Sequence, residues 1–328
     1  MTPSVLVIGC GSIGLRHLRN LKALGVEALL AFDPSDDARE AARAIGARPF
    51  ERLDAAFDAR PGLVLVCTPP HVHVRDARRA VAAGADVFIE KPVDVAATPD
   101  LDALIGEAAS AGRIAAAGYN LRCHPGLRAI KQAFDAGAIG APLLIDVEFG
   151  FYLPDWRPGR DYRENYGARK EQGGGILLDA SHEVDYLRWL AGEAVAVQAV
   201  LDRIGTLEMD VEDTACLTVR LASGALAQLR VDCLQRRYTR RCKIAGERGS
   251  LEWTWEGGAT QWIAGDAAPS PLAGVPDVND MYVEEMRGLL EAVRERRDPV
   301  STVADARKTL QLIDAARRAS AERREVAI

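Results

Sequence analysis

Short apolar runs alternate with stretches of helical periodicity over roughly the first third of the chain. The apolar runs are four or five residues long and rich in branched side chains, which is typical of buried strands. They cover residues 5–8, 28–32, 63–67, 86–89 and 114–118. The helical stretches between them cover 15–24, 36–45, 71–83 and 99–111. This alternation predicts the α/β class, with a doubly wound parallel sheet, for residues 1–122.

The pattern changes after Arg122. A helix at 124–136, a strand at 142–151, a polar and aromatic loop at 152–175 and a helix at 177–190 come first. Strand-like runs separated by Gly-containing turns then fill 195–263, and helical patterns cover 280–297 and 303–323. We therefore expect residues 123–328 to form an α+β domain built on an open, mostly antiparallel sheet.

Glycines at the spacing G-x-G-x-x-G lie between the first strand and the first helix. This context predicts a dinucleotide site, in which the glycines allow a tight turn, a close approach of the pyrophosphate and close helix packing. Asp33 ends the second strand, where an acid would accept hydrogen bonds from the adenosine ribose. The alternative is a glycine-rich turn that binds nothing. The predicted cofactor contacts here are Gly9, Gly11, Ser12, Ile13, Gly14 and Asp33.

Charge and composition exclude several classes of protein. The chain has 328 residues and a net charge of −6, so no polyanion such as a nucleic acid is expected as partner. No apolar run approaches membrane-spanning length, and the chain begins directly with a strand, so we expect a cytoplasmic protein. The six cysteines form no C-x-x-C pair, which favours buried thiols over disulfides or a metal site. A basic cluster at 236–241 is interpreted as a solvated strand face or an ion-paired interface.

Polar residues follow several predicted strands directly. Because the carboxyl ends of parallel strands share one edge, we expect Thr68, Glu90, Lys91 and Asn120 to line one crevice. A lysine there can hydrogen-bond or protonate an oxygen on a carbon that exchanges hydride. The alternative is a surface lysine that forms a salt bridge with Glu90.

A second chemical cluster follows three glycines at 173–175. On one continuous helix Asp179 and His182 would share a face, and the carboxylate could orient the ring and raise its basicity. His182 could then accept a hydroxyl proton. The alternative is that Asp179 caps the helix and His182 packs in the core.

These motifs together resemble the glucose–fructose oxidoreductase, inositol dehydrogenase and rhizopine-catabolism (Gfo/Idh/MocA) family. The matching segments occur in order along the chain and cover both predicted domains. They are 9–14, Thr68-Pro69-Pro70-His71-Val72-His73, Glu90-Lys91-Pro92, and the Gly-Gly-Gly…Asp…His-x-x-Asp segment at 173–185.

The resemblance implies NAD(P)-dependent hydride transfer at a secondary alcohol or ketone of a sugar, sugar derivative or polyol. Lys91, His182 and Asp179 would be catalytic, and Thr68, His73 and Glu90 would lie at the cofactor. It also implies a cis Lys91–Pro92 bond, and a homodimer or homotetramer formed through the C-terminal sheet. Two departures are the spacing Asp179-x-x-His182, which leaves Glu183 or Asp185 as alternatives to Asp179, and Pro70, where many members have asparagine.

Cofactor and substrate preferences follow from single residues. Asp33 favours NAD over NADP, because a carboxylate repels a 2′-phosphate, and no basic residue follows before Arg39. In the loop at 152–172, aromatic and arginine side chains suggest an acidic, phosphorylated or nucleotide-linked sugar, with a solvated loop as the alternative. The substrate candidates of this loop are Trp156 and Arg163. The resemblance implies that Asn120, Arg122 and His124 line the same crevice, which adds them as substrate candidates.

Two other functions use the same fold. One is an NAD-dependent glycoside hydrolase, in which a transient oxidation leaves no net redox change. The other is a non-catalytic sensor of sugar or dinucleotide, against which Lys91 and His182 argue, because a sensor needs no proton-transfer group.

Overall fold

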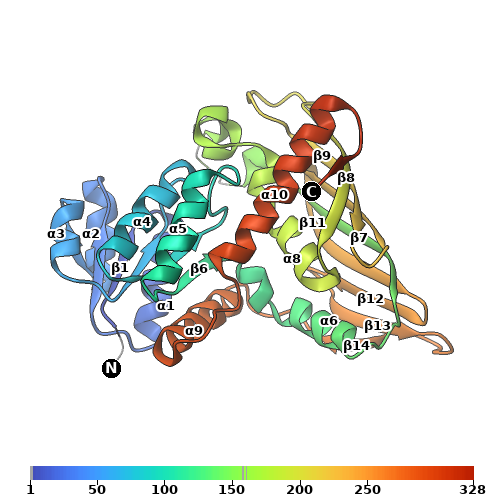
Figure 1. The fold of residues 1–328 in the computed structure, drawn as a ribbon, viewed down its shortest axis with the longest axis horizontal. Helices are drawn as coiled ribbons and strands as arrows, with labels where there is room; N and C mark the ends of the chain where they lie inside the picture. The colour runs from blue at the N-terminus through green and yellow to red at the C-terminus, as the bar shows by residue number, and fades with distance from the viewer. Residues whose placement is uncertain (1–2, 157–158, 160) are drawn as a thin grey trace. The chain divides into compact units, whose positions relative to one another are not determined.

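The computed structural model describes residues 3–156, 159 and 161–328 (Figure 1). The chain divides into two compact units. The first unit contains the residues up to Cys123 together with Val278–Lys308, and the second contains His124–Asp277 and Thr309–Ile328. The division from sequence put 278–308 with the second domain, whereas in the structure this segment packs with the first unit.

The first unit is built on a parallel sheet with the strand order β3-β2-β1-β4-β5-β6. Its strands are β1 (Val5–Ile8), β2 (Leu29–Phe32), β3 (Arg48–Phe50), β4 (Leu63–Val66), β5 (Asp86–Glu90) and β6 (Ala115–Gly118). Its α-helices are α1 (Ser12–Ala23), α2 (Asp36–Ile45), α3 (Leu53–Asp58), α4 (His73–Ala82), α5 (Pro99–Ser110) and α9 (Asp280–Glu295), with 3₁₀ turns η1 (Pro70–Val72) and η2 (Asn120–Cys123). Strands β1 and β4 are completely buried, as their continuous apolar runs require. The α/β prediction for this half is confirmed.

The second unit carries a mixed, mostly antiparallel sheet with the order β14-β13-β12-β11-β7-β10-β9-β8-β15 in the described part of the chain. Within the described part of this second sheet, only the β7–β10 pairing is parallel. The strands are β7 (Pro142–Tyr152), β8 (Ala194–Asp202), β9 (Thr214–Leu221), β10 (Leu226–Asp232), β11 (Leu234–Gly246), β12 (Gly249–Thr254), β13 (Gly258–Ile263), β14 (Ser270–Ala273) and β15 (Val326–Ala327). The helices are α6 (Pro125–Asp135), α7 (Ile176–Asp179) and α8 (Ser181–Ala191), while α10 (Val303–Glu322) begins in the first unit and ends in this one. The α+β prediction is confirmed.

The loop after β7 is a series of short turns instead of an irregular segment. These 3₁₀ turns are η3 (Leu153–Asp155), η4 (Tyr162–Glu164), η5 (Tyr166–Ala168) and η6 (Lys170–Gln172). Asp161 and Asn165 start two of them by accepting a backbone N–H two residues later.

The predicted helix over 177–190 is wrong in one respect. The structure divides it into α7 and α8 at Ala180, whose ψ of 26° is not helical. The physical reason lies in the sheet: α7 packs on β9 and β10, whereas α8 packs on β7 and α6, so one straight helix cannot follow both. The interpretation that placed Asp179 and His182 on one continuous helix face is therefore corrected.

The sequence patterns also missed small elements, namely β3, α3, β14 and β15. Each is six residues or shorter, too short for a periodic signal. None of the helices in the described residues is both long and apolar enough to cross a membrane.

Candidate functional site

The turn between β1 and α1 has the geometry that a dinucleotide site requires. Gly9 has a φ of 91°, and a Cβ there would meet the backbone of Cys67 and Thr68 at the end of β4. A Cβ on Gly14 would clash with the carbonyl oxygen of Gly9, so this residue allows helix and strand to pack closely. A Cβ on Gly11 would meet nothing within 4 Å, and no side chain caps α1 at this residue. The first turn of α1 therefore presents backbone N–H groups at an open position, which fits a pyrophosphate.

Asp33 lies immediately beside this turn. One of its carboxylate oxygens accepts the Cys10 N–H at 2.8 Å and the other accepts the Ser35 N–H at 2.9 Å. The carboxylate is thereby held at the end of β2. The next basic residue along the chain, Arg39, donates to the carbonyl oxygens of Asp33 and Pro34 and pairs with Asp36. Its guanidinium is therefore committed within its own helix turn.

Thr68 and His73 lie at the end of β4 and the start of α4. The His73 ring is buried, and its nitrogens lie 2.9 Å from the Pro92 carbonyl oxygen and 2.5 Å from that of Thr68. Burial lowers the pKa of His73. The ring therefore connects the backbone after β4 with the backbone after β5. His73 thus positions these two segments through its contacts with their carbonyl oxygens.

Glu90 and Lys91 occupy the carboxyl end of β5. The Glu90 side chain is turned into the first unit, where one oxygen lies 2.6 Å from the His17 ring and the other accepts the Lys91 backbone N–H at 3.1 Å. Lys91 is partly buried, and the Lys91–Pro92 peptide bond is cis, as the resemblance implies. Glu90 therefore contacts Lys91 through the backbone.

Asn120 and Arg122 lie in η2, and both are buried. Asn120 hydrogen-bonds the Tyr282 phenol on α9. Arg122 donates to Asp305 at the start of α10 and to the Val300 carbonyl oxygen at 3.3 Å. These contacts hold the segment 300–305 on the first unit, so Arg122 has a structural use that the sequence did not indicate.

The Asp179–His182 region belongs to the second unit. Asp179 ends α7 and accepts the Tyr166 hydroxyl, while His182 lies in the first turn of α8 and is partly buried. Glu183 is fully buried and accepts from Arg240 Nε at 2.6 Å. Asp185 is buried and accepts from the Thr309 hydroxyl at 3.4 Å. Each carboxylate near His182 thus has a partner of its own.

Two of the three glycines before α7 are required by packing. A Cβ on Gly174 would meet the carbonyl oxygens of Tyr166 and Arg169, and one on Gly175 would meet the Glu212 carboxylate. These glycines therefore let the loop fold back on itself, which gives them a role without a ligand.

The loop after β7 carries Trp156 and Arg163. Trp156 is 48% exposed and stacks on Tyr238 with an interplanar angle of 12°. Arg163 is exposed and donates to both oxygens of Asp161 and to Glu208. Its fork is therefore occupied by carboxylates of the same unit, which gives an acidic substrate no support from this residue. Arg157 and Arg160 lie outside the described residues.

The basic cluster at 236–241 separates into individual contacts. Arg236 lies over the Tyr152 ring, Arg237 pairs with Glu256, and Arg241 pairs with Glu148. Arg240, whose side chain is 9% exposed, pairs with the fully buried Glu183. The interpretation as an ion-paired face describes this arrangement. All six cysteines are free, and five are buried.

The sequence interpretation missed His17 and Glu285. His17 belongs to the buried face of α1, and Glu285 lies four residues after buried Met281 and four before buried Leu289 on α9. A polar residue within an apolar stripe is the signal that would have found both.

A parallel sheet with a glycine-rich βα turn, an acid at the end of β2 and a lysine beyond β5, followed by an α+β unit, defines a two-domain dinucleotide-dependent oxidoreductase. Residues 4–119 match the family described as "Oxidoreductase family, NAD-binding Rossmann fold", and 127–252 match the "GFO/IDH/MocA C-terminal domain". The chain belongs to the Gfo/Idh/MocA family of oxidoreductases with an NAD-binding Rossmann fold, and the resemblance is confirmed.

Named relatives agree with this assignment. An inositol 2-dehydrogenase of Burkholderia cenocepacia is 31% identical over 263 residues, which are 76% of this chain and 73% of the relative. A myo-inositol 2-dehydrogenase of Thermotoga maritima is 28% identical over 342 residues, covering 98% and 97%. The crystal structure of GenD2 from gentamicin A biosynthesis, in complex with NAD, has a TM-score of 0.84 at 28% identity and covers 99% and 95%. Levoglucosan dehydrogenase in complex with NADH has the same fold, with a TM-score of 0.88 at 21% identity over 99% and 98% of the two chains.

Proposed function

We propose that the protein is an NAD-dependent dehydrogenase that transfers hydride between nicotinamide and a secondary alcohol or ketone of a sugar, sugar derivative or polyol. The observation that carries the proposal is the β1–α1 turn with Asp33 beside it and Lys91 at the end of β5 of the same sheet. The inositol dehydrogenases among the relatives support the substrate class.

Three regions of the first unit would hold the cofactor. The first turn of α1, with Gly11, Ser12 and Ile13, would receive the pyrophosphate, and Asp33 would accept the ribose hydroxyls. Thr68 and Glu90 lie at the carboxyl ends of β4 and β5, the side of a parallel sheet where nicotinamide sites form. Once bound, the cofactor supplies a hydride acceptor or donor.

Lys91 and His182 would manage the proton. In oxidation, the hydroxyl proton must leave the oxygen of the carbon that loses hydride, and an amine or imidazole within hydrogen-bond reach accepts it. We assign the hydrogen bond to this oxygen to Lys91 and the proton acceptance to His182. Asp179, which ends α7 three residues before His182, would assist the imidazole.

Lys91→Ala tests the assignment. We expect kcat for the best substrate to fall about 100-fold or more, because a positioned acid–base group contributes a factor of that order. NAD affinity should change little, which fluorescence titration with NADH would check. Lys131→Ala is the matched control, since Lys131 pairs with Asp135 on α6. Turnover of the variant within about threefold of the original protein would remove Lys91 from the mechanism.

We also propose that the protein uses NAD in preference to NADP. Asp33 is held beside the glycine-rich turn, where its carboxylate would repel a 2′-phosphate. The Arg39 guanidinium is already bonded to two carbonyl oxygens and to Asp36, so it is not available to neutralise that phosphate. Asp33→Ala should weaken NAD binding by about tenfold and narrow the preference over NADP. Asp37→Ala, at the exposed start of α2, is the control, because it leaves the pair between Asp36 and Arg39 intact. Unchanged affinity for NAD in Asp33→Ala would contradict the cofactor assignment.

Product analysis separates the competing functions. A panel of sugars and polyols, including acidic and nucleotide-linked ones, would be incubated with NAD. A dehydrogenase yields net NADH, an NAD-dependent glycoside hydrolase releases a glycone without net NADH, and a sensor binds without turnover.

We further propose a homodimer or homotetramer formed through the second unit's sheet. Leu144 on β7 is 55% exposed and Val200 on β8 is 63% exposed. Apolar side chains exposed in this way on a sheet are typical of a surface that another subunit covers. Light scattering coupled to gel filtration measures the state, and Val200→Asp should shift it toward the monomer.

A further inference from the structure

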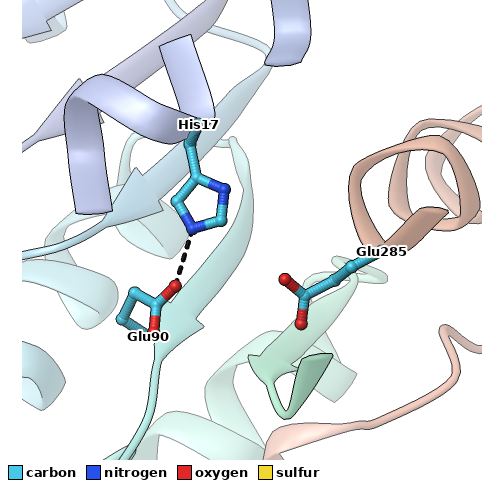
Figure 2. A group of neighbouring side chains, drawn as sticks. All are labelled: His17, Glu90 and Glu285. Carbon is cyan, nitrogen blue, oxygen red and sulfur yellow. Dashed lines mark hydrogen bonds and ion pairs between the residues drawn. The ribbon is translucent and has the colours of Figure 1, made fainter. Parts of the chain in front are cut away.

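Three titratable side chains meet inside the first unit, beneath the end of β5. His17 comes from α1, Glu90 from β5 and Glu285 from α9, and all are buried. One nitrogen or oxygen atom of each lies within 4.8 Å of the others. Figure 2 shows the Glu285 carboxylate directed toward the other two side chains, while the only bond drawn joins His17 and Glu90.

The His17–Glu90 contact defines the charge of two members. His17 Nε2 lies 2.6 Å from Glu90 Oε1, whereas His17 Nδ1 is buried without a hydrogen-bond partner among the described residues. A doubly protonated ring would bury an unpaired N–H, so the geometry favours a neutral ring that donates from Nε2. Glu90 is then the acceptor in both of its bonds, to His17 and to the Lys91 N–H, and carries the negative charge.

Glu285 has no such partner. It is 4% exposed, and neither carboxylate oxygen has a hydrogen bond within the described part of the chain. An ionised carboxylate without a donor or a counter-ion is very costly to bury. Burial, and secondly the Glu90 charge, raise the pKa of Glu285 well above its ordinary value of 4.5.

No described residue pairs with Glu285 to neutralise it. Besides His17 and Glu90, the titratable groups that interact with this cluster include the Cys67 thiol after β4, the Tyr282 phenol on α9 and the His73 ring on α4. Burial raises the pKa of the thiol and of the phenol and lowers the pKa of the His73 ring, so all three are uncharged. Arg16 on α1 lies over the Tyr282 ring, 4.4 Å from its centre. Lys91 follows Glu90 in the chain and is bonded to it through the backbone.

We propose that Glu285 is a positioning residue for Lys91, held as an uncharged carboxylic acid so that Glu90 carries the only negative charge of the three side chains. This inference rests on the catalytic role proposed for Lys91. With one charge, Glu90 remains bonded to the ring of His17 and to the backbone N–H that begins the Lys91 turn. Ionisation of Glu285 would put a second negative charge within 4.8 Å and strain both contacts.

The stability of the protein tests the protonation state without any substrate. The pKa of Glu285 is raised by folding, so its contribution to stability is complete below about pH 4.5 and is lost as the pH rises through the folded value. Glu285→Gln keeps the shape and removes the titration. Between about pH 5 and about pH 9, the Tm of this variant relative to the original protein should rise by about 2 °C or more.

Glu284→Gln is the matched control, because Glu284 is the preceding residue on α9, is more exposed, and pairs with Arg287. Its Tm difference should not depend on pH in this range. An infrared band of a protonated buried carboxyl, absent from Glu285→Gln, would support the proposal directly. A Tm difference of Glu285→Gln that is negative and independent of pH would overturn it, because an ionised and paired Glu285 gives that result.

Kinetics test the positioning role. With the best substrate of the panel, the alkaline limb of kcat against pH should move up by about one pH unit in Glu285→Gln and stay in place in Glu284→Gln. An unmoved limb would overturn the positioning role. Stoichiometric Zn²⁺ binding that is lost in Glu285→Gln would also overturn the proposal, since a metal ligand must be ionised. If the panel gave no turnover at all, the proposed function would fail while the Tm and infrared results still decided the state of Glu285.

Discussion

Each of the two units buries a titratable side chain beside a fixed charge of the same sign. In the first unit, Glu285 lies near Glu90, and burial and this negative charge raise its pKa. In the second unit, His124 caps α6 beneath Trp253, and burial and the positive charge of Arg240 lower its pKa to about 4. Both side chains are therefore kept uncharged near neutral pH, by the same two causes acting on groups of opposite kind.

The two fixed charges are balanced in different ways. Arg240 has a full counter-ion in Glu183 and lies over the ring of Phe149, 4.5 Å from its centre. Glu90 has a neutral imidazole and a backbone N–H instead. A paired charge can therefore be buried within a sheet, whereas a charge balanced only by neutral donors requires a neighbouring acid to remain protonated.

The largest effect should follow from breaking the buried pair. Arg240→Met leaves the fully buried Glu183 without a counter-ion, and we expect a loss of about 3–5 kcal/mol in the free energy of unfolding. Urea unfolding at neutral pH measures it. The unpaired Glu183 should also disturb the first turn of α8. Because His182 is the neighbouring residue in that turn, kcat should fall in the fraction that remains folded.

Two comparisons sharpen this prediction. Arg237 lies three residues before Arg240 and forms an exposed ion pair with Glu256. Arg237→Met removes this pair and should lower the free energy of unfolding by about 1 kcal/mol or less. The double variant Arg240→Met with Glu183→Gln should recover much of the stability, because no unpaired charge then remains. If Arg240→Met cost no more than Arg237→Met, the buried pair would not stabilise the second unit.

The parts of the site that were predictable from sequence are those encoded by contiguous residues. The turn at 9–14 and the strand ends at Asp33 and Glu90 are local patterns, and the structure has them as expected. The helix predicted at 36–45 is matched residue for residue, because the Ser35 side chain caps its start and Gly46, with a φ of 109°, follows its end. Local agreement of this kind needs no tertiary information.

The remaining features depend on contacts distant in sequence. The division of the helix at Ala180 follows from which strands α7 and α8 cover, and a helical pattern carries no such information. Glu285 is 195 residues from Glu90 by their numbers, and Arg240 is 57 from Glu183. The sequence predicts that a charged residue is buried only when its partner is known, because most charged residues on a helix face solvent.

A smaller effect, opposite in sign to that of Glu285, is expected from His124. Its pKa of about 4 in the folded protein lies below the ordinary 6.5, so its contribution to stability is complete above about pH 6.5 and is lost as the pH falls toward 4. The shift corresponds to roughly 3 kcal/mol over that range. His124→Asn retains an N-cap acceptor for the Gly126 N–H but does not titrate, so its urea stability should fall less steeply with acid than that of the original protein. An equal acid dependence in both proteins would mean that folding leaves the pKa of His124 unchanged. Burial and the Arg240 charge would then not disfavour the charged ring, and the parallel between the two units would not hold.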